Sequence, residues 1–242
     1  MAVAAKIDTR FREYSCIVTG QFEEPNCDTG VPHFPPARFE VWGNNQVFYD
    51  TFSDALQRCP YNPVLIEVAG TIYIEEDLKY SSLSTLWIRG VLHLNETTGD
   101  VYSPTIVGFK NLYTTYVNTT IIFDSIFLEG CGTTDPLFTS NHETLPGSLI
   151  DQTFLATNIT VSNYASPIVL KQYSSDNTTF FAIENSRFVN INNTAINVIG
   201  DQAIRIHNNV FSNCGNDEHT CVIMQRHEDI SNGIEMTANR YT

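Results

Sequence analysis

Apolar and polar residues alternate along short segments of this chain, and the alternation recurs with asparagines at fixed places. The two clearest copies are FAIENSRFVNINN at 181–193 and AIRIHNNVFSNCGN at 203–216. In both copies one residue lies between two apolar residues, and an asparagine stands two positions after the second of these. A phenylalanine then stands two positions before a second asparagine. Because successive side chains of a strand point to opposite faces, each copy predicts short strands with one buried face.

Five copies of this pattern align on one apolar position. The residues at that position are Phe127, Val161, Phe188, Phe211 and Tyr241. The position five residues earlier is also apolar in every copy, and it holds Ile122, Ala156, Ile183, Ile206 and Met236. The copies follow one another at irregular intervals, which is typical of the coils of a solenoid with loops of variable length. The alignment therefore predicts parallel strands stacked coil upon coil.

Two other columns of the alignment hold short polar side chains. Three residues before the apolar position stand Asp124, Asn158, Asn185, Asn208 and Ala238, and two residues after it stand Glu129, Asn163, Asn190 and Asn213. Asparagine tolerates left-handed backbone angles and so suits a sharp corner. Amides stacked about 4.8 Å apart can also bond to one another along the stack. We expect the asparagines of both columns to form a structural ladder at the corners of the coils.

The earlier part of the chain fits the same architecture with wider coils. VLIEVAGTIYI (64–74), STLWIRGVLHL (84–94) and SPTIVGF (103–109) predict short apolar strands ended by glycine. TFSDALQRC (51–59) places its apolar residues at helical spacing, and Thr51 with Asp54 forms a capping box. This predicts a short amphipathic helix that covers the open end of the first coil. Residues 1–50 predict an irregular arm, which either embraces a neighbour or packs against the chain's own helix.

Together, FSDALQRC, VLIEVAGTIYI, TLWIRG, PTIVGF and the repeated coils resemble the pectin lyase-like superfamily of right-handed parallel β-helices. The resemblance covers roughly residues 50–242. It implies an all-β, right-handed parallel β-helix (solenoid) with a short N-terminal capping α-helix, a β-helix domain over 51–242 and an irregular arm over 1–50. Families of this shape include polysaccharide lyases and hydrolases, phage tailspikes, adhesins and structural proteins of large viruses.

The catalytic motifs that this resemblance implies are missing from the sequence. The lyases use an arginine or lysine base and an aspartate cluster that holds Ca²⁺, and the Arg-x-Pro-x-x-Arg pattern is absent here. The hydrolases carry Asn-Thr-Asp, Asp-Asp, Gly-His-Gly and Arg-Ile-Lys, and none of these is present. Glycoside hydrolysis ordinarily needs a pair of carboxylates. The sequence therefore favours a protein without catalytic activity, and it indicates no cofactor.

Glu184 and His207 are the best remaining catalytic candidates, because they occupy the same outward column on adjacent coils. Arg205 and Arg187 stand nearby. A carboxylate about 5 Å from an imidazole can do acid–base work. The alternative is a surface ion pair between coils.

A second charged group lies in DEHTCVIMQRHED (217–229). Its acidic residues and histidines could suggest a metal site. If TCVIMQ is an extended strand, however, His219 and His227 lie roughly 25 Å apart, which is too far for one ion. We therefore expect solvated charges in turns and no metal site. Aromatic residues that could instead stack on a sugar, or anchor the core and loops, are Trp42, Trp87, Tyr113, Tyr116 and Tyr173.

Composition narrows the partners of this protein. The net charge of −14 argues against binding nucleic acid through its phosphates or approaching an anionic membrane. The sequence has no apolar stretch long enough to insert into a membrane and shows no signal peptide. Asn-x-Ser/Thr sequons, which are possible glycosylation sites, occur at Asn95, Asn118, Asn158, Asn177 and Asn192. Pairing of Cys16 with Cys27 and of Cys214 with Cys221, or buried free thiols, are alternatives for the cysteines.

The segment GIEMTANRYT ends directly after an aligned apolar position, so the last coil is expected to expose strand edges. Either further chain follows it or a partner covers that end. Our leading hypothesis is a non-catalytic structural or interaction β-helix, such as a capsid or surface component of a large virus. Its partners would be other subunits or copies of itself, on a virion or an extracellular surface. The alternatives are a polysaccharide lyase or glycosidase with an atypical site, or a glycan-binding adhesin module.

Overall fold

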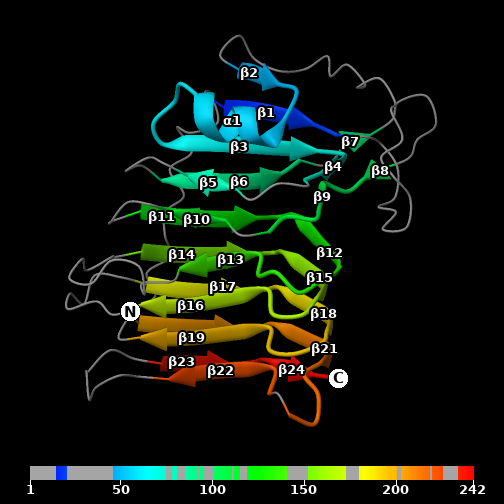
Figure 1. Cartoon of the computed structure of the whole chain (residues 1–242), viewed down its shortest axis with the longest axis vertical. Helices are drawn as coiled ribbons and strands as arrows, with labels where there is room; N and C mark the ends of the chain where they lie inside the picture. The colour runs from blue at the N-terminus through cyan, green and yellow to red at the C-terminus, as the bar shows by residue number, and fades with distance from the viewer. Residues whose placement is uncertain are drawn as a thin grey trace.

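The computed structural model describes residues 15–20, 46–74, 78–80, 85–91, 93–94, 101–110, 112–114, 119–140, 152–172, 180–200, 203–218, 220–225 and 234–242. These residues form an all-β parallel β-helix with one short α-helix (Figure 1). The coils are stacked along the long axis of the molecule, with the helix near one end and the last strands at the other. The fold class predicted from the sequence is therefore confirmed.

Strands from successive coils build three main parallel sheets. In order across the first sheet these are β2 (Gln46–Tyr49), β1 (Ser15–Thr19), β3 (Val64–Ala69), β6 (Leu86–Gly90), β11 (Thr119–Asp124), β14 (Gln152–Thr157), β17 (Phe180–Glu184), β20 (Ala203–His207) and β23 (Ile234–Thr237). The second sheet contains β4 (Thr71–Tyr73), β9 (Thr105–Val107), β12 (Phe127–Thr133), β15 (Thr160–Tyr164), β18 (Arg187–Ile191), β21 (Val210–Cys214) and β24 (Arg240–Tyr241). The third contains β13 (Phe138–Ser140), β16 (Ile168–Gln172), β19 (Ile196–Gly200) and β22 (Val222–Gln225).

Each later coil visits the three sheets in the same order. The strands β17, β18 and β19 belong to the first, second and third sheets. The strands β20, β21 and β22 repeat that order in the next coil, and each pairs with its counterpart. Two small pairs complete the structure: the parallel strands β5 (Lys79–Tyr80) and β10 (Tyr113–Thr114), and the antiparallel strands β7 (His93–Leu94) and β8 (Val101–Tyr102).

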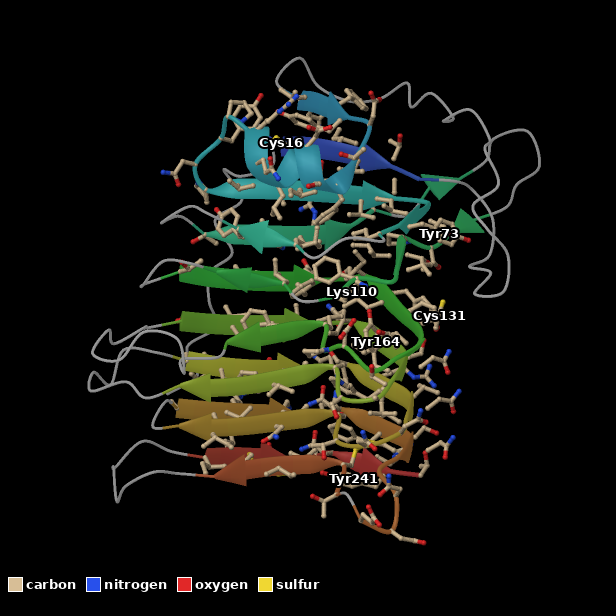
Figure 2. The ribbon with its side chains drawn as sticks, in the orientation of Figure 1. Cys16, Tyr73, Lys110, Cys131, Tyr164 and Tyr241 are labelled. Atoms are coloured by element: carbon tan, nitrogen blue, oxygen red, sulfur yellow. A yellow bond between two sulfur atoms is a disulfide. The ribbon has the colours of Figure 1, made fainter. Side chains whose placement is uncertain are left out.

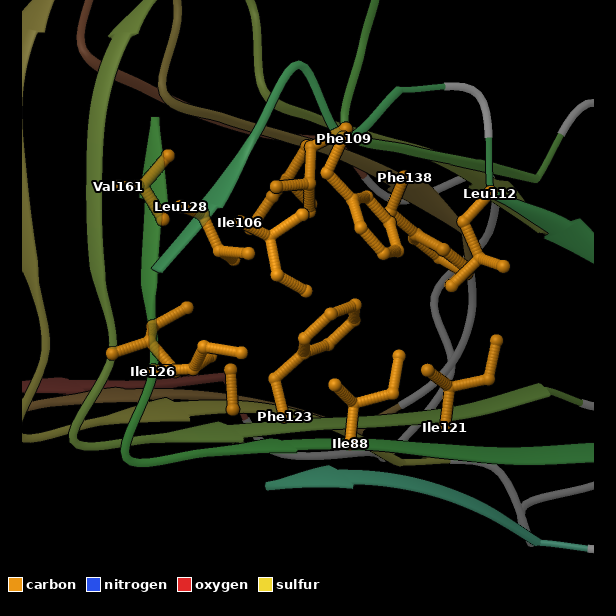
Figure 3. Close-up of a cluster of buried hydrophobic side chains, with 14 of the residues drawn as sticks. Ile88, Ile106, Phe109, Leu112, Ile121, Phe123, Ile126, Leu128, Phe138 and Val161 are labelled. Carbon is orange, nitrogen blue, oxygen red and sulfur yellow. The ribbon is translucent and has the colours of Figure 1, made fainter. Parts of the chain in front are cut away.

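Large apolar side chains fill the interior of the coil (Figure 3). Phe154 and Phe181, on neighbouring strands of the first sheet, stack with their ring centroids 5.4 Å apart. On the second sheet Phe188 stacks on Phe211, which stacks on Tyr241, at 5.2 and 5.1 Å. Burying each such side chain contributes about 1.5–3 kcal/mol. The stacked apolar columns therefore hold successive coils in register.

The helix α1 (Phe52–Arg58) begins as the sequence predicts. The backbone N–H of Asp54 donates to Oγ1 of Thr51, and the Thr51 hydroxyl donates to the Asp54 carboxylate. The buried face of the helix consists of Phe52, Ala55 and Leu56. Its C-terminal cap residue, Cys59, is bonded to Cys16 of β1 by a disulfide.

The sheet begins earlier than the sequence analysis placed it. The strands β1 and β2 lie within the predicted irregular arm, yet β1 pairs with β3 and β2 pairs with β1, all in parallel. Four consecutive residues of the segment SCIVT are buried, so this strand is buried on both faces and lacks the alternation of apolar and polar residues. A short run without alternation is hard to recognise as a strand from the sequence. The other residues of 1–50 lie outside the described ranges.

The first copy of the aligned pattern is shifted by one residue from its predicted register. Phe123, and not Ile122, pairs with Ala156, and Leu128, and not Phe127, pairs with Val161. Phe123 and Leu128 are fully buried, whereas Ile122 and Phe127 are only partly so. The register also shifts again between Glu129 and Thr133, where β12 bulges against β15. The sequence pattern fits both registers because apolar residues stand side by side at 122–123 and at 127–128.

Candidate functional site

The two leading catalytic candidates lie on one outward column of the first sheet. Glu184 at the end of β17 is the register partner of His207 at the end of β20, as the sequence alignment places them. Both side chains are partly exposed. Adjacency in register does not by itself pair them, because each can bond elsewhere.

Glu184 forms an ion pair with Arg205. The Arg205 Nε lies 3.1 Å from Glu184 Oε1 and 3.4 Å from Glu235 Oε2, so the arginine sits between two carboxylates. Arg205 Nε is nevertheless buried without a hydrogen bond, which means that its N–H is not aimed at either oxygen. The contact is thus electrostatic, and for side chains this exposed it stabilises the fold by at most about 1 kcal/mol.

His207 bonds to the next coil. Its Nδ1 lies 2.7 Å from Thr237 Oγ1 of β23. Among the described residues His207 makes no ion pair with Glu184, whose carboxylate faces Arg205. Glu184, Arg205 and His207 therefore link neighbouring strands. The Glu184 carboxylate is paired with Arg205 and not with the His207 imidazole.

The charged segment 217–229 is described only in part. Asp217 and Glu218 lie in an exposed turn, and the Glu218 N–H donates to Oδ1 of Asn216. His219, His227, Glu228 and Asp229 lie outside the described residues. No group of three metal-ligating side chains occurs in the part of the chain that the structure describes.

The aromatic residues proposed for sugar stacking do not gather on one described surface. Trp87 is 7 % exposed, with the Arg89 guanidinium 5.5 Å from its ring centroid, so the ring offers no open face. Trp42, Tyr116 and Tyr173 lie outside the described residues, and of Tyr113 only the backbone is described.

A buried ion pair on the first sheet escaped the sequence analysis. Glu67 of β3 is buried and pairs with Arg89 of β6 in the adjacent register position. The Ser15 hydroxyl of β1 donates to the other Glu67 oxygen at 2.7 Å. The carboxylate is thus fully engaged between three strands. Its signal in the sequence was a lone glutamate within the apolar run VLIEVA.

The asparagines of the second corner column are hydrogen bonded from coil to coil. Asn213 Nδ2 donates to Asn190 Oδ1 at 2.9 Å, and Asn190 Nδ2 donates to Asn163 Oδ1 at 3.3 Å. Asn163 Nδ2 then donates to both carboxylate oxygens of Glu129. Each amide therefore donates toward the preceding coil, and the column ends on an anion that can only accept.

Glu129 itself is buried inside this network. It also accepts from the Cys131 N–H at 2.9 Å and from the Ser162 hydroxyl. Nearby Tyr164 is buried and donates its hydroxyl to the Phe109 carbonyl at 2.7 Å. Burial, with a smaller contribution from the Glu129 charge, raises the pKa of the Tyr164 phenol well above its usual range. The sequence alignment placed Glu129 level with Asn163 and Asp124 level with Asn158, which is wrong by one residue, because the register pairs Glu129 with Ser162 and Asp124 with Thr157.

The first corner column turns the chain from the first sheet to the second. Ser125, Asn158, Asn185, Asn208 and Ala238 all have φ between 52° and 56°. Asn208 Nδ2 donates to Asn185 Oδ1 at 2.8 Å. At the equivalent corner of the β3–β4 coil stands Gly70, with φ of 70°. These positions need left-handed backbone, which glycine and asparagine supply at the lowest cost.

Replacing Ala238 by asparagine should stabilise the protein by about 1 kcal/mol. Ala238 has φ of 56°, and left-handed backbone costs an ordinary residue about 1–2 kcal/mol. An amide at this position can also donate to Asn208 and add one rung to the column. The measurement is the midpoint of urea unfolding, with Arg240→Asn, at an exposed position of the same coil, as the control. An unchanged or lower midpoint for Ala238→Asn would contradict this expectation.

A second, buried ladder beside this corner was not predicted. Asn209 is 1 % exposed, and its Nδ2 donates to the Ile183 carbonyl at 2.8 Å and to Asn239 Oδ1 at 3.1 Å. Its Oδ1 accepts from the Ser186 N–H at 2.9 Å. Asn239 repeats the arrangement by donating to the Ile206 carbonyl at 2.8 Å. The signal that could have revealed it is the paired Asn208-Asn209, with Asn239 at the same place one coil later.

Disulfides join the described cysteines, one pair across the fold and one pair across a turn. Cys16 is bonded to Cys59 and Cys214 to Cys221, and Cys131 is also disulfide bonded. Among the described residues no cysteine is free. Pairing of Cys16 with Cys27 is therefore wrong, because β1 lies against the end of α1, while the pairing of Cys214 with Cys221 is confirmed. The latter closes the turn between β21 and β22.

The last coil exposes the residues that continue the core columns. Ile234 and Met236 of β23 pair in register with Ile204 and Ile206, and Tyr241 of β24 pairs with Phe211. They are 41 %, 39 % and 53 % exposed, whereas the residues beneath them are buried. Within the described ranges β23 and β24 each pair with a single strand. Figure 2 shows Tyr241 at this end of the stack.

Comparison with known proteins adds no relative to this description. No family model matches the chain, and neither a curated protein nor a solved structure matches it. Within the described ranges there is no helix of the length and apolar character needed to cross a membrane. The structure thus defines a parallel β-helix with bonded asparagine columns, in which apolar residues of β23 and β24 are exposed among the described residues.

Proposed function

We propose that this protein is a non-catalytic structural β-helix that assembles end to end, as a capsid or surface component of a large virus or of a comparable particle. The observation that carries the proposal is the exposure of Ile234, Met236 and Tyr241 on β23 and β24, although these residues continue the apolar columns of the core. We also propose that it is related to the pectin lyase-like β-helices.

The chemistry of the end formed by β23 and β24 indicates what kind of surface covers it. Unpaired strand edges bind best to another strand, because each strand supplies the missing hydrogen-bond partners. The exposed side chains continue the columns of the core, so the surface they match is an apolar layer with the same spacing. A further β-helical coil has both properties.

A second copy of the same chain is the occupant we propose. The first sheet ends in β23 on one side and in β2 on the other, and all its strands run parallel. In the described ranges β2 pairs with β1 alone. Parallel pairing of β23 with β2 of the next copy would continue the sheet. Such a head-to-tail contact builds a ring or a filament.

Two further observations support a structural role outside the reducing interior of a cell. The disulfides suit an oxidising compartment or a particle surface. Arg205 pairs with Glu184 on the adjacent strand and His207 bonds to Thr237 of the next coil, as expected for residues that brace adjacent coils.

The test is the oligomeric state of the purified chain, measured by sedimentation velocity over a concentration series. We expect wild-type protein to associate as its concentration rises. The Met236→Lys variant should remain monomeric, because a charge in the apolar column opposes burial. The matched control is Arg240→Ala, which alters an exposed residue of β24 whose register partner Val210 lies outside the core cluster.

A monomer at every concentration would contradict end-to-end assembly of identical copies. Release of reducing or unsaturated ends from a panel of neutral and acidic glycans, abolished by Glu184→Gln and His207→Ala, would contradict the non-catalytic assignment. The two measurements use the same purified protein.

A further inference from the structure

Many of the described asparagines have side chains that hydrogen bond to a neighbouring coil. Those with hydrogen-bonded side chains are Asn163, Asn185, Asn190, Asn193, Asn208, Asn209, Asn213, Asn216 and Asn239. In the sequence none of these is followed two residues later by serine or threonine. The bonded amides therefore all lie outside N-glycosylation sequons.

The two described asparagines that lie within sequons differ from these. Asn158 is followed by Ile159 and Thr160, and Asn192 is followed by Asn193 and Thr194. Both side chains are exposed, and among the described residues neither side-chain amide has a hydrogen-bond partner. Their backbones are nevertheless fixed: the Asn158 N–H donates to the Glu184 carbonyl and the Asn192 N–H to the Tyr164 carbonyl.

We propose that Asn158 and Asn192 carry N-linked oligosaccharides. Asn158 lies at the corner between β14 and β15, and Asn192 directly follows β18 where the chain turns toward the third sheet. Attachment of a sugar to either Nδ2 breaks no hydrogen bond between coils among the described residues and places the glycan in solvent. The same modification of Asn209 would remove one of its two amide N–H groups, both of which are hydrogen bonded.

The disulfides point to the compartment in which this modification takes place. Disulfides form in the oxidising lumen of the secretory pathway, where asparagine is also glycosylated. The donor is an oligosaccharide linked to a lipid diphosphate. Its C1–O bond to phosphate breaks, a bond from C1 to the asparagine Nδ2 forms, and the amide gives up one proton as the lipid diphosphate leaves.

This inference does not depend on the end-to-end assembly proposed above. Both acceptors lie at lateral corners of the coil, away from the edges of β23 and β24. Glycans there would cover the sides of the stack and leave the end formed by β23 and β24 available. Either proposal can therefore fail without the other.

The experiment is to express the full chain in a eukaryotic secretory line and to map its glycans. Treatment with an amidase that releases N-glycans, carried out in ¹⁸O water, converts each glycosylated asparagine to ¹⁸O-labelled aspartate. We expect the label in the peptides that contain Asn158 and Asn192. If both peptides are recovered unlabelled, the proposal is overturned, and if one is unlabelled, the assignment of that residue is overturned.

Single variants provide the second readout on intact protein. Asn158→Gly and Asn192→Gln should each reduce the mass by one oligosaccharide, and glycine suits the left-handed φ of 54° at position 158. The matched control is Asn193→Gln, which keeps the sequon at Asn192 and should keep the full glycan mass. Loss of a glycan from the control, or no loss from both variants, would refute the assignment.

Discussion

Replacing Asn209 by alanine should destabilise the protein by about 3 kcal/mol, because a buried polar group that loses its partner costs about 1–3 kcal/mol. The Asn209 side chain bonds the Ile183 carbonyl, the Ser186 N–H and Asn239, and it is almost fully buried. Alanine leaves the Ser186 N–H facing apolar surroundings at a corner that water does not reach. The measurement is urea unfolding followed by circular dichroism.

The neighbouring Asn208→Gly is the matched control for this prediction. Asn208 is exposed, its φ is 53°, and its amide makes one bond, to Asn185. Glycine accepts this backbone angle, and water replaces the lost bond, so the cost should stay below about 1 kcal/mol. Equal losses for the two variants would show that the buried ladder carries no special share of the stability.

Replacing Glu129 by glutamine should destabilise the protein by about 2–3 kcal/mol. The carboxylate accepts from the Cys131 N–H, the Ser162 hydroxyl and the Asn163 amide, and hydrogen bonds to a charged group contribute about 1.5–3 kcal/mol each. Glutamine keeps the shape but turns an NH₂ group toward donors. It also changes the end of the Asn213–Asn190–Asn163 column from an acceptor into a competing donor.

Glu184→Gln is the same chemical change on an outward, partly exposed carboxylate and serves as the control. Among the described residues Glu184 pairs with Arg205 alone, and Arg205 keeps Glu235 as a second partner. We expect a loss below about 1 kcal/mol. Should the two variants unfold at the same urea concentration, the carboxylate of Glu129 would not be the anchor of the column.

The outward candidates were predictable because their positions follow from alternation alone. Glu184 and His207 stand at the same place in two copies that align without a gap, and the structure pairs them in register. Their bonding was not predictable, because it depends on rotamers and on what lies one coil further along. His207 turns to Thr237, and Glu184 turns to Arg205.

The first coil shows where the alignment of copies fails. In the copy formed by β11 and β12, apolar residues stand side by side as Ile122–Phe123 and as Phe127–Leu128, so the sequence pattern fits either register. Burial selects Phe123 and Leu128 because a shift of one residue moves every side chain to the other face. Sequence alone offers no measure of which face is inside when two adjacent residues are both apolar.

By itself the sequence determined the period of two, the corner asparagines and the cap of the helix, since each depends on residues within a few positions of one another. The tertiary structure alone decided that Cys16 meets Cys59, that β1 and β2 extend the first sheet, and that Asn209 is buried while Asn208 is exposed. These outcomes join residues from different coils, and the loops between coils vary in length. Local pattern fixes which way a side chain faces, but only the stacked coils decide which partner it meets.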